Sequence, residues 1–181
     1  MLEKEGLLVQ KREMECITYF GGKCMTEKAM QIKQLAELKL VGIRVLCAAD
    51  QYIVQIPKAS LELSERISEI KHVINPMQQV GAFVVENDTD EQDGYFICVE
   101  VQEYENIPTD MVALTIPSQK YAVLRHKGDN EKIIDSYHQL HKWIDENNFV
   151  RQKDKWHLEI FHSWVNSKNI DVELLDTIDF K

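Results

Sequence analysis

The chain of 181 residues is 44% hydrophobic and 28% charged, with seven glycines and four prolines. This composition is typical of a globular protein and excludes low-complexity and fibrous classes. The formal net charge of −9 at pH 7 argues against direct nucleic-acid binding, because phosphate contacts need clustered Lys and Arg.

The cysteines and the N-terminus carry no signal for a metal site or for export. Cys16, Cys24, Cys47 and Cys98 form no CxxC pair, so neither a zinc finger nor a thioredoxin-like site is predicted. The segment Met1–Glu5 lacks the basic and apolar regions of a secretory signal, and no apolar run has transmembrane length. We therefore expect a cytoplasmic protein that does not contact the membrane.

Residues 1–36 form an N-terminal arm to which the sequence assigns no role. Gly21-Gly22 is typical of a small hairpin, and a helix over Thr26–Leu35 is a further expectation. The arm is too short for a three-helix DNA-binding module with its own core, and no recognition helix is found in it.

The segment that follows the arm predicts a strand, a helix and two more strands. Leu63, Ile67, Ile70 and Ile74 follow a helical i, i+4, i+7, i+11 rhythm, and Pro76 is expected to end this helix. The predicted strands are Leu40–Cys47, Val80–Glu86 and Gly94–Val101. The acidic stretch between the last two strands is predicted to be a solvated hairpin tip.

The second half of the chain predicts the same order of elements. Ile133, Tyr137, Leu140 and Ile144 repeat the helical rhythm seventy positions later, after Asp129 or Asn130 as the helix cap. The predicted strands are Tyr121–Lys127, Trp156–Val165 and Ile170–Ile178. The chain from residue 37 to 181 thus reads as two βαββ repeats, about 38–108 and about 111–181.

A single βαββ unit would leave its sheet uncovered, so the two units are expected to join their strands. The predicted fold is α+β, with two tandem βαββ modules forming one antiparallel sheet and both helices packed on one face. A ligand cleft is expected between the modules.

Glu159 stands out because its neighbours in the sequence are apolar. Strand alternation places it on one face with His157 and Phe161, opposite Leu158 and Ile160. If that face meets the helices, the carboxylate is buried, and burial raises its pKa toward the range useful for acid–base catalysis. The alternative is an exposed glutamate on a strand.

Aromatic residues are candidates for the wall of the same cleft. Tyr137 lies on the apolar stripe of its helix, where it could stack on a flat ligand or hydrogen-bond to Glu159. Strands or their ends supply further candidates: Tyr52, Phe83, Tyr95 and Tyr121. For each of these side chains, a plain core role is the alternative.

No cofactor is predicted. His138 and His141 share a helix side and His157 and His162 flank Glu159, but no coherent third ligand completes a zinc site, and a solvated polar face is the preferred interpretation. The sequence contains no P-loop, GxGxxG or GxSxG motif, so nucleotide binding and serine hydrolysis are not predicted.

Several motifs in order resemble the GyrI-like effector-binding family. Ile116–Gly128 resembles its IPxGxYAVFxHxG segment, with Gln119 where glycine is usual, and Ser136–Ile144 is similar to its TYxxLxxWL helix. Leu158–Phe161 resembles its xExY strand, with phenylalanine in place of the commoner tyrosine. Looser matches in the first half are Val41-Gly42-Ile43, Ile56-Pro57 and Gly94-Tyr95.

The resemblance implies a pocket for lipophilic, often cationic or aromatic small molecules, with Glu159 as the carboxylate in the cavity and Phe161 in its wall. It also implies that hydrolysis of cyclopropane-bearing toxins by Glu159 is an alternative to binding alone. A different role is a ligand-sensing module that acts with a separate DNA-binding partner. A homodimer or a regulatory protein partner therefore stays open, and the sequence does not identify the ligand.

Overall fold

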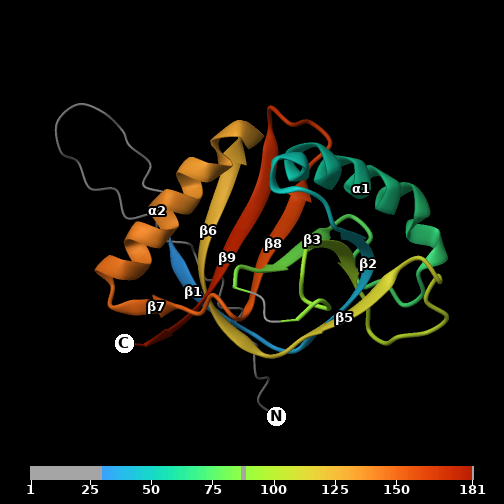
Figure 1. Cartoon of the computed structure of the whole chain (residues 1–181), viewed down its shortest axis with the longest axis horizontal. Helices are drawn as coiled ribbons and strands as arrows, with labels where there is room; N and C mark the ends of the chain where they lie inside the picture. The colour runs from blue at the N-terminus through green and yellow to red at the C-terminus, as the bar shows by residue number, and fades with distance from the viewer. Residues whose placement is uncertain (1–29, 87–88, 181) are drawn as a thin grey trace, which may run out of the picture.

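The computed structural model describes residues 30–86 and 89–180, and these contain nine strands and two α-helices (Figure 1). The strands are β1 (Gln31–Leu35), β2 (Leu38–Val45), β3 (Gln79–Val84), β4 (Tyr95–Glu100), β5 (Val112–Ile116), β6 (Gln119–Gly128), β7 (Phe149–Arg151), β8 (Trp156–Ser163) and β9 (Ile170–Phe180). The helices are α1 (Tyr52–Arg66) and α2 (Ile133–Glu146). No helix within these residues is long and apolar enough to span a membrane.

The strands form one antiparallel sheet built from two similar halves. Its order is β1-β6-β9-β8-β3-β4-β2-β5, with β7 paired to β9. One half is β2-α1-β3-β4 and the other is β6-α2-β8-β9, and they join where β3 pairs with β8. The predicted α+β fold of two βαββ modules is therefore confirmed, with β1, β5 and β7 as strands that the sequence did not predict.

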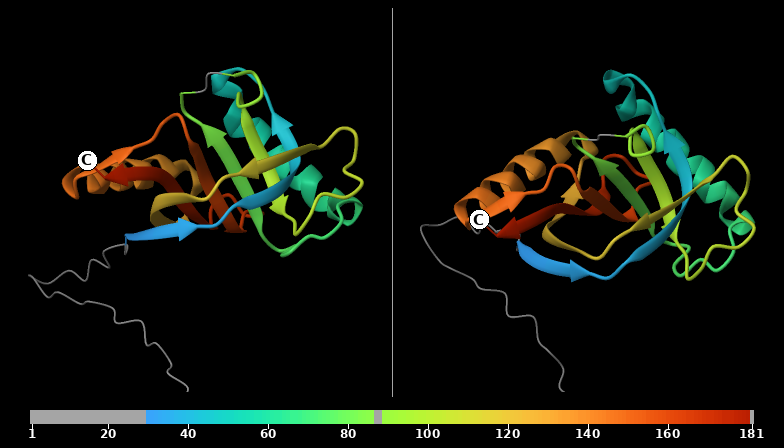
Figure 2. Two further views of the ribbon diagram at one scale, coloured as in Figure 1. Left: turned by 90° about the horizontal axis from the view of Figure 1, so that it is seen from below. Right: turned by 60° about the horizontal axis from the view of Figure 1, so that its bottom comes forward.

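A long two-stranded ribbon ties the two halves together. The strands β1 and β2 run almost continuously along β5 and β6, and the register does not change at the break: Leu35 pairs with Gln119 and Leu38 with Ile116. As a result, β1 pairs with the edge of one half and β5 with the edge of the other (Figure 2). The ribbon thus protects both outer strands, β6 and β2, from exposure as free edges.

Two hydrophobic clusters lie on opposite faces of the sheet. The cluster on the helix face includes Leu63 of α1 and Leu140 of α2 together with Ile97 and Leu174 of the sheet. The other cluster lies on the opposite face, on the side of the ribbon, and contains Leu40, Phe96, Ile116, Tyr121, Trp156 and Leu158. Because both faces are covered in the middle of the sheet, the central strands β3, β4 and β8 alternate between two apolar environments rather than between core and solvent.

The first helix is not where the sequence predicted it. It begins at Tyr52 and ends at Arg66, and a 3₁₀ turn over Ile67–Glu69 leads to an extended Ile70. The predicted helix over Leu63–Ile74 is thus wrong for most of its length. Pro57 lies inside the helix on an exposed side, where water can satisfy the carbonyl group that loses its partner.

The repeat of the helices has a different offset from the predicted seventy residues. The two helices begin at Tyr52 and Ile133, which are 81 positions apart. At this offset the inward stripe Ile56, Ala59 and Leu63 matches the stripe Tyr137, Leu140 and Ile144. The counterpart of Tyr137 in α1 is therefore Ile56, whose side chain has no hydroxyl group.

The start of α2 agrees with the prediction. The side chain of Asp129 accepts a hydrogen bond from the backbone N–H of Glu131 at 3.0 Å, which caps the 3₁₀ turn that leads into the helix. A buried serine then fixes each helix to the sheet: Ser136 lies 2.7 Å from His126, and Ser60 bonds to Gln79. The two helices are held in place by polar anchors as well as by apolar packing.

The expected helix over Thr26–Leu35 is wrong in its described part. Gln31–Leu35 forms β1 and pairs with β6 over five residues. Pairing with an available strand edge outweighs the weak helical propensity of this segment. The hairpin expected at Gly21-Gly22 lies outside the described residues.

Candidate functional site

Glu159 lies on β8, on the sheet face that the helices cover. Its neighbour Phe161 belongs to the helix-side cluster, whereas Leu158 and Trp156 belong to the cluster on the other face. The predicted alternation along this strand is confirmed. Only 9% of Glu159 is exposed, and its strand neighbours are Gly81 of β3 and Leu174 of β9.

Two tyrosine hydroxyl groups donate hydrogen bonds to the Glu159 carboxylate. Tyr95 on β4 donates to Oε2 at 2.5 Å, and Tyr137 on α2 donates to Oε1 at 2.6 Å. The two tyrosines come from different modules, so the site exists only when both halves are assembled. The sequence analysis considered a hydrogen bond between Tyr137 and Glu159 as one role of this tyrosine, and the structure contains this bond.

Gly81 allows Tyr95 to reach Glu159. The two residues are on β4 and β8, with β3 between them, so the tyrosine side chain has to cross β3. A Cβ atom at Gly81 would lie 1.8 Å from the Tyr95 hydroxyl oxygen and 2.5 Å from Cζ. The missing side chain is therefore the passage through which the hydroxyl group approaches the carboxylate.

We expect Gly81→Ala to displace Tyr95 and to lower the free energy of unfolding by about 1–3 kcal/mol, because the added methyl group overpacks the site. Denaturant unfolding measures this loss. In a Tyr95→Leu background, the same glycine substitution should cost much less, since its clash partner is gone. Equal losses in both backgrounds would show that Gly81 acts through something other than Tyr95.

Burial sets the electrostatics of the site. Desolvation raises the pKa of Glu159 above its usual range, and the hydrogen bonds from Tyr137 and Tyr95 offset part of that rise. Burial, followed by the nearby Glu159 charge, raises the pKa of both tyrosines well above the usual value. The tyrosines therefore remain protonated donors, and the carboxylate is the group that can change its charge.

The structure places the other candidate residues as follows. Phe83 stacks on Tyr95 with ring centroids 5.9 Å apart, and Phe161 is buried two residues after Glu159 on the same face. Tyr52, the first residue of α1, is half-buried against the same cluster. Tyr121 is completely buried in the other cluster and lies on the opposite face.

Tyr121 points away from Glu159 because strand alternation on β6 turns it to the ribbon side. Its hydroxyl group accepts a hydrogen bond from Gln119 at 2.7 Å, and Gln119 also donates to the carbonyl of Trp156 at 3.0 Å. The glutamine that replaces the usual glycine of the motif thus ties β6 to β8. This pair belongs to the interior of the fold, not to the wall of the cleft.

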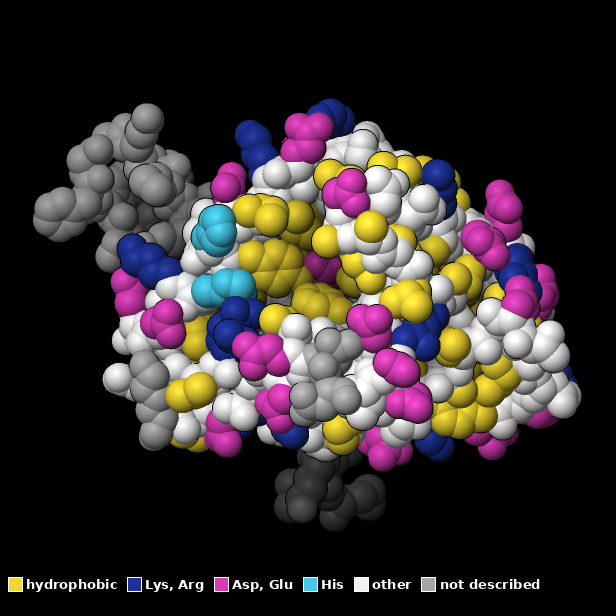
Figure 3. Space-filling model, in the orientation of Figure 1, with side chains coloured by type: hydrophobic (Ala, Val, Ile, Leu, Met, Phe, Trp, Pro, Cys, Tyr) yellow, Lys and Arg dark blue, Asp and Glu magenta, His cyan; other side chains and the backbone are white. Residues whose placement is uncertain are grey.

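A hollow lies between α1 and α2 in the space-filling view. Figure 3 shows hydrophobic side chains around this hollow and an acidic side chain at its floor. Its rim is formed by the two helices, and its floor is the middle of the sheet. The shape and the lining suit a molecule that is mostly apolar.

A buried charge network adjoins the site on β9. Only 1% of the Asp176 side chain is exposed, and its oxygens lie 2.5 Å from His157 Nδ1, 2.7 Å from His141 Nε2 and 2.8 Å from Arg151 Nε. Burial alone would raise the pKa of Asp176, but the hydrogen bonds from these partners hold it well below the usual range. Asp176 therefore stays ionised, and sequence reasoning missed it because its partners come from α2, β7 and β8.

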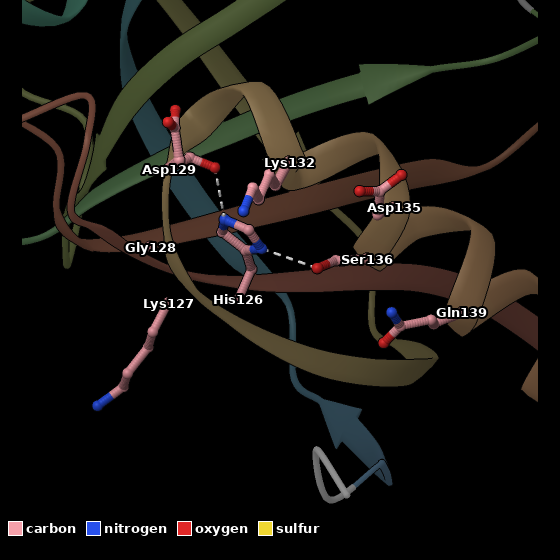
Figure 4. Close-up of a pocket in the computed structure, with 8 residues that line it drawn as sticks. All are labelled: His126, Lys127, Gly128, Asp129, Lys132, Asp135, Ser136 and Gln139. Atoms are coloured by element: carbon pink, nitrogen blue, oxygen red, sulfur yellow. Dashed lines mark hydrogen bonds between the residues drawn. The ribbon is translucent and has the colours of Figure 1, made fainter. Parts of the chain in front are cut away.

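A second cavity, of about 290 Å³, lies at the start of α2 (Figure 4). Its lining is mostly charged or polar and includes Lys127, Asp129, Lys132, Asp135 and Gln139. His126 reaches from β6 toward Ser136, and its Nε2 lies 3.1 Å from the Asp129 carbonyl. None of the predicted ligand residues borders this cavity, and its polarity does not suit a lipophilic molecule.

One group in the described part of the chain has the spacing of a metal site. Ligand atoms of His72, Glu103 and Glu105 lie within 4.8 Å of one another, but all three residues are exposed. Hydrogen bonds from Lys71 and His72 lower the pKa of Glu105 to about 2, so the surface ion pairs already account for this cluster. The four histidines that suggested a zinc site do not converge on one point: His141 and His157 both contact Asp176, whereas His138 is exposed and His162 lies near Gln78.

A duplicated α+β module with an apolar hollow and a buried carboxylate defines a small-molecule-binding domain. The family model for the "GyrI-like small molecule binding domain" matches residues 28–175. The chain therefore belongs to the GyrI-like family. Comparison with curated protein sequences gave no match.

Solved structures share the fold at low sequence identity. SAV2435 bound to tetraphenylphosphonium superimposes with a TM-score of 0.62 at 18% identity, covering 83% of this chain and 94% of that one. A structure described as a putative bacterial transcription regulation protein from Staphylococcus aureus MU50 has a TM-score of 0.59 at 19% identity. This match covers 84% of this chain and 99% of the other. EcmrR in a complex with DNA has a TM-score of 0.62 at 14% identity, and the match covers 84% of this chain and 58% of the EcmrR chain.

Proposed function

We propose that the chain binds lipophilic organic cations in the hollow between α1 and α2, with Glu159 as the countercharge. The observation that carries this proposal is a buried carboxylate that has two hydroxyl donors and no cationic partner. Among residues 30–86 and 89–180, no lysine, arginine or histidine forms an ion pair with Glu159. An ionised carboxylate in such a place is costly unless a positive charge joins it.

The aromatic side chains around Glu159 favour a cation that carries apolar groups. Tyr95 and Tyr137 contact the carboxylate directly and Phe83 stacks on Tyr95, and aromatic faces attract positive charge within about 6 Å of the ring centroid. The hydroxyl groups of the two tyrosines hold the carboxylate in place, so little order has to be created when a ligand binds. The structural neighbour SAV2435 with tetraphenylphosphonium supports this class of ligand.

Calorimetric titration with tetraphenylphosphonium tests the proposal, with neutral triphenylphosphine oxide as the matched comparison. We expect saturable binding of the cation and much weaker binding of the neutral compound. Because burial raises the pKa of Glu159, the affinity for the cation should fall as the pH decreases through that raised value. Equal affinity for both compounds at all pH values would rule out a role for the charge.

Hydrolysis of an activated cyclopropane is a second candidate, favoured by the raised pKa of Glu159. In this reaction a water oxygen bonds to a ring carbon while the ring C–C bond breaks and its electron pair moves into the conjugated acceptor. Glu159 takes the proton that the water loses, and the acceptor takes up a proton, so the net change is addition of one water. Mass spectrometry would detect that product, whereas saturable binding without product favours sequestration or sensing.

A sensing role would require a partner that reads the occupied state. The fold is shared with EcmrR in a DNA complex, but the charge of −9 disfavours direct contact of this chain with nucleic acid. A homodimer or a separate regulatory protein is the partner for this alternative. The binding proposal is common to both roles, since a sensor and a sequestering protein each need the Glu159 pocket.

A further inference from the structure

His157 has one ring nitrogen that the fold does not use. Its Nδ1 lies 2.5 Å from Asp176 Oδ1, whereas Nε2 is buried and has no hydrogen-bond partner in the described part of the chain. The residue is only 1% exposed. A buried polar atom without a partner is uncommon in folded proteins and marks a place where a ligand or a bound water belongs.

The position of His157 on β8 places its side chain beside the Glu159 site. The two residues are two apart on β8 and so share the sheet face under the helices. The Phe83 ring stacks on two other rings, that of Tyr95 at a centroid distance of 5.9 Å and that of His157 at 5.6 Å. One aromatic wall therefore runs from the tyrosine that holds Glu159 to the histidine.

Asp176 determines whether His157 Nε2 donates or accepts a hydrogen bond. A carboxylate only accepts hydrogen bonds, so the proton of the neutral imidazole lies on Nδ1, and Nε2 presents a lone pair. The Asp176 carboxylate also contacts His141 and Arg151, so it is held from several sides and keeps the imidazole in one orientation. Nδ1 and Nε2 lie on different sides of the ring, which directs Nε2 away from Asp176.

We propose that His157 Nε2 is a specificity contact of the pocket and accepts a hydrogen bond from an O–H or N–H group of the bound molecule. The inference rests on the proposed function and narrows its ligand class. Preferred ligands are lipophilic cations that carry a hydroxyl or an N–H group at the reach of His157, in addition to the positive charge that faces Glu159.

The test uses tetraphenylphosphonium and its 2-, 3- and 4-(hydroxymethyl)phenyl analogues, whose alcohol O–H group donates a hydrogen bond without ionising, all titrated in the same buffer. We expect at least one hydroxymethyl isomer to bind the natural chain about 3- to 10-fold more tightly than the parent cation. His157→Phe should keep the affinity for the parent and lose the preference. His138→Phe, at an exposed position on α2, should keep both.

A measurement on the unsubstituted protein covers the case in which His157→Phe does not fold. The ¹⁵N resonance of His157 Nε2 should shift when the preferred isomer is added and stay nearly unchanged with the parent cation. If the parent cation binds, but no isomer is preferred and the resonance does not shift, the inference about His157 is overturned while the proposed cation binding remains supported. No binding of any of these compounds would overturn both.

Discussion

Replacing Glu159 by glutamine is expected to weaken the binding of tetraphenylphosphonium by about 2–5 kcal/mol, roughly 30- to 5,000-fold in Kd. Glutamine keeps the volume and accepts a hydrogen bond from one tyrosine, but it carries no charge. The loss therefore reports the desolvated countercharge rather than the shape of the pocket. Calorimetry of Glu159→Gln beside the unsubstituted chain measures it, with triphenylphosphine oxide as the ligand that should be little affected.

The same variant should be no less stable than the unsubstituted protein at neutral pH. The pKa of Glu159 is raised in the folded state, so the unfolded chain ionises first as the pH rises. The destabilisation caused by the buried Glu159 charge is absent below the pKa of this group in the unfolded chain. It grows as the pH rises and is complete above the pKa in the folded state. We expect Glu159→Gln to melt at an equal or higher temperature at pH 7. Full cation affinity in a folded variant would mean that Glu159 is not the site.

Removing the Asp176 carboxylate is expected to destabilise the fold by about 3–5 kcal/mol, because Asp176→Ala leaves the partly buried Arg151 without its countercharge and the buried His157 Nδ1–H without its acceptor. Equilibrium unfolding in urea measures the loss. The pKa of Asp176 is depressed in the folded state, so its contribution is present above the unfolded pKa, near 3.9, and is lost as the pH falls through the folded value.

Asp171→Ala is the matched control on the same strand. Asp171 also pairs with cations, with oxygens 2.7 Å from Arg125 Nε and 3.2 Å from Lys127 Nζ, but 21% of its side chain is exposed. Solvent screens such a pair, and we expect its removal to cost no more than about 1 kcal/mol. Similar losses for the two aspartates would contradict the assignment of Asp176 as a buried anchor.

The fold was predictable where a local pattern coincides with burial. The stripe of α2 from Ile133 to Ile144 and the alternation around Glu159 both follow from residue periodicity, and both agree with the structure. In α1 the pattern misled, because Ala59 contributes little hydrophobic signal and Ile67, Ile70 and Ile74 continue the helical rhythm beyond the end of the helix at Arg66. The segment Gln31–Leu35 became a strand only because β6 offers a distant edge.

The candidate site was predictable only in part, since it is assembled from distant strands. The carboxylate and Tyr137 were found from local patterns, and Tyr95 from its place at a strand start. Gly81 was missed because its role depends on the tyrosine that crosses β3. Tyr121 was included because sequence alone does not determine to which face a strand turns when both faces are apolar.

The most direct test of the central claim is a crystal structure of the chain with tetraphenylphosphonium. The account predicts the phosphonium in the hollow between α1 and α2, above the Glu159 carboxylate, with a phenyl group against the rings of Phe83 or Tyr95. The hydroxyl groups of Tyr95 and Tyr137 should still hold the carboxylate. Ligand bound in the polar cavity at the start of α2, or a hollow that stays empty at saturating ligand, would contradict it.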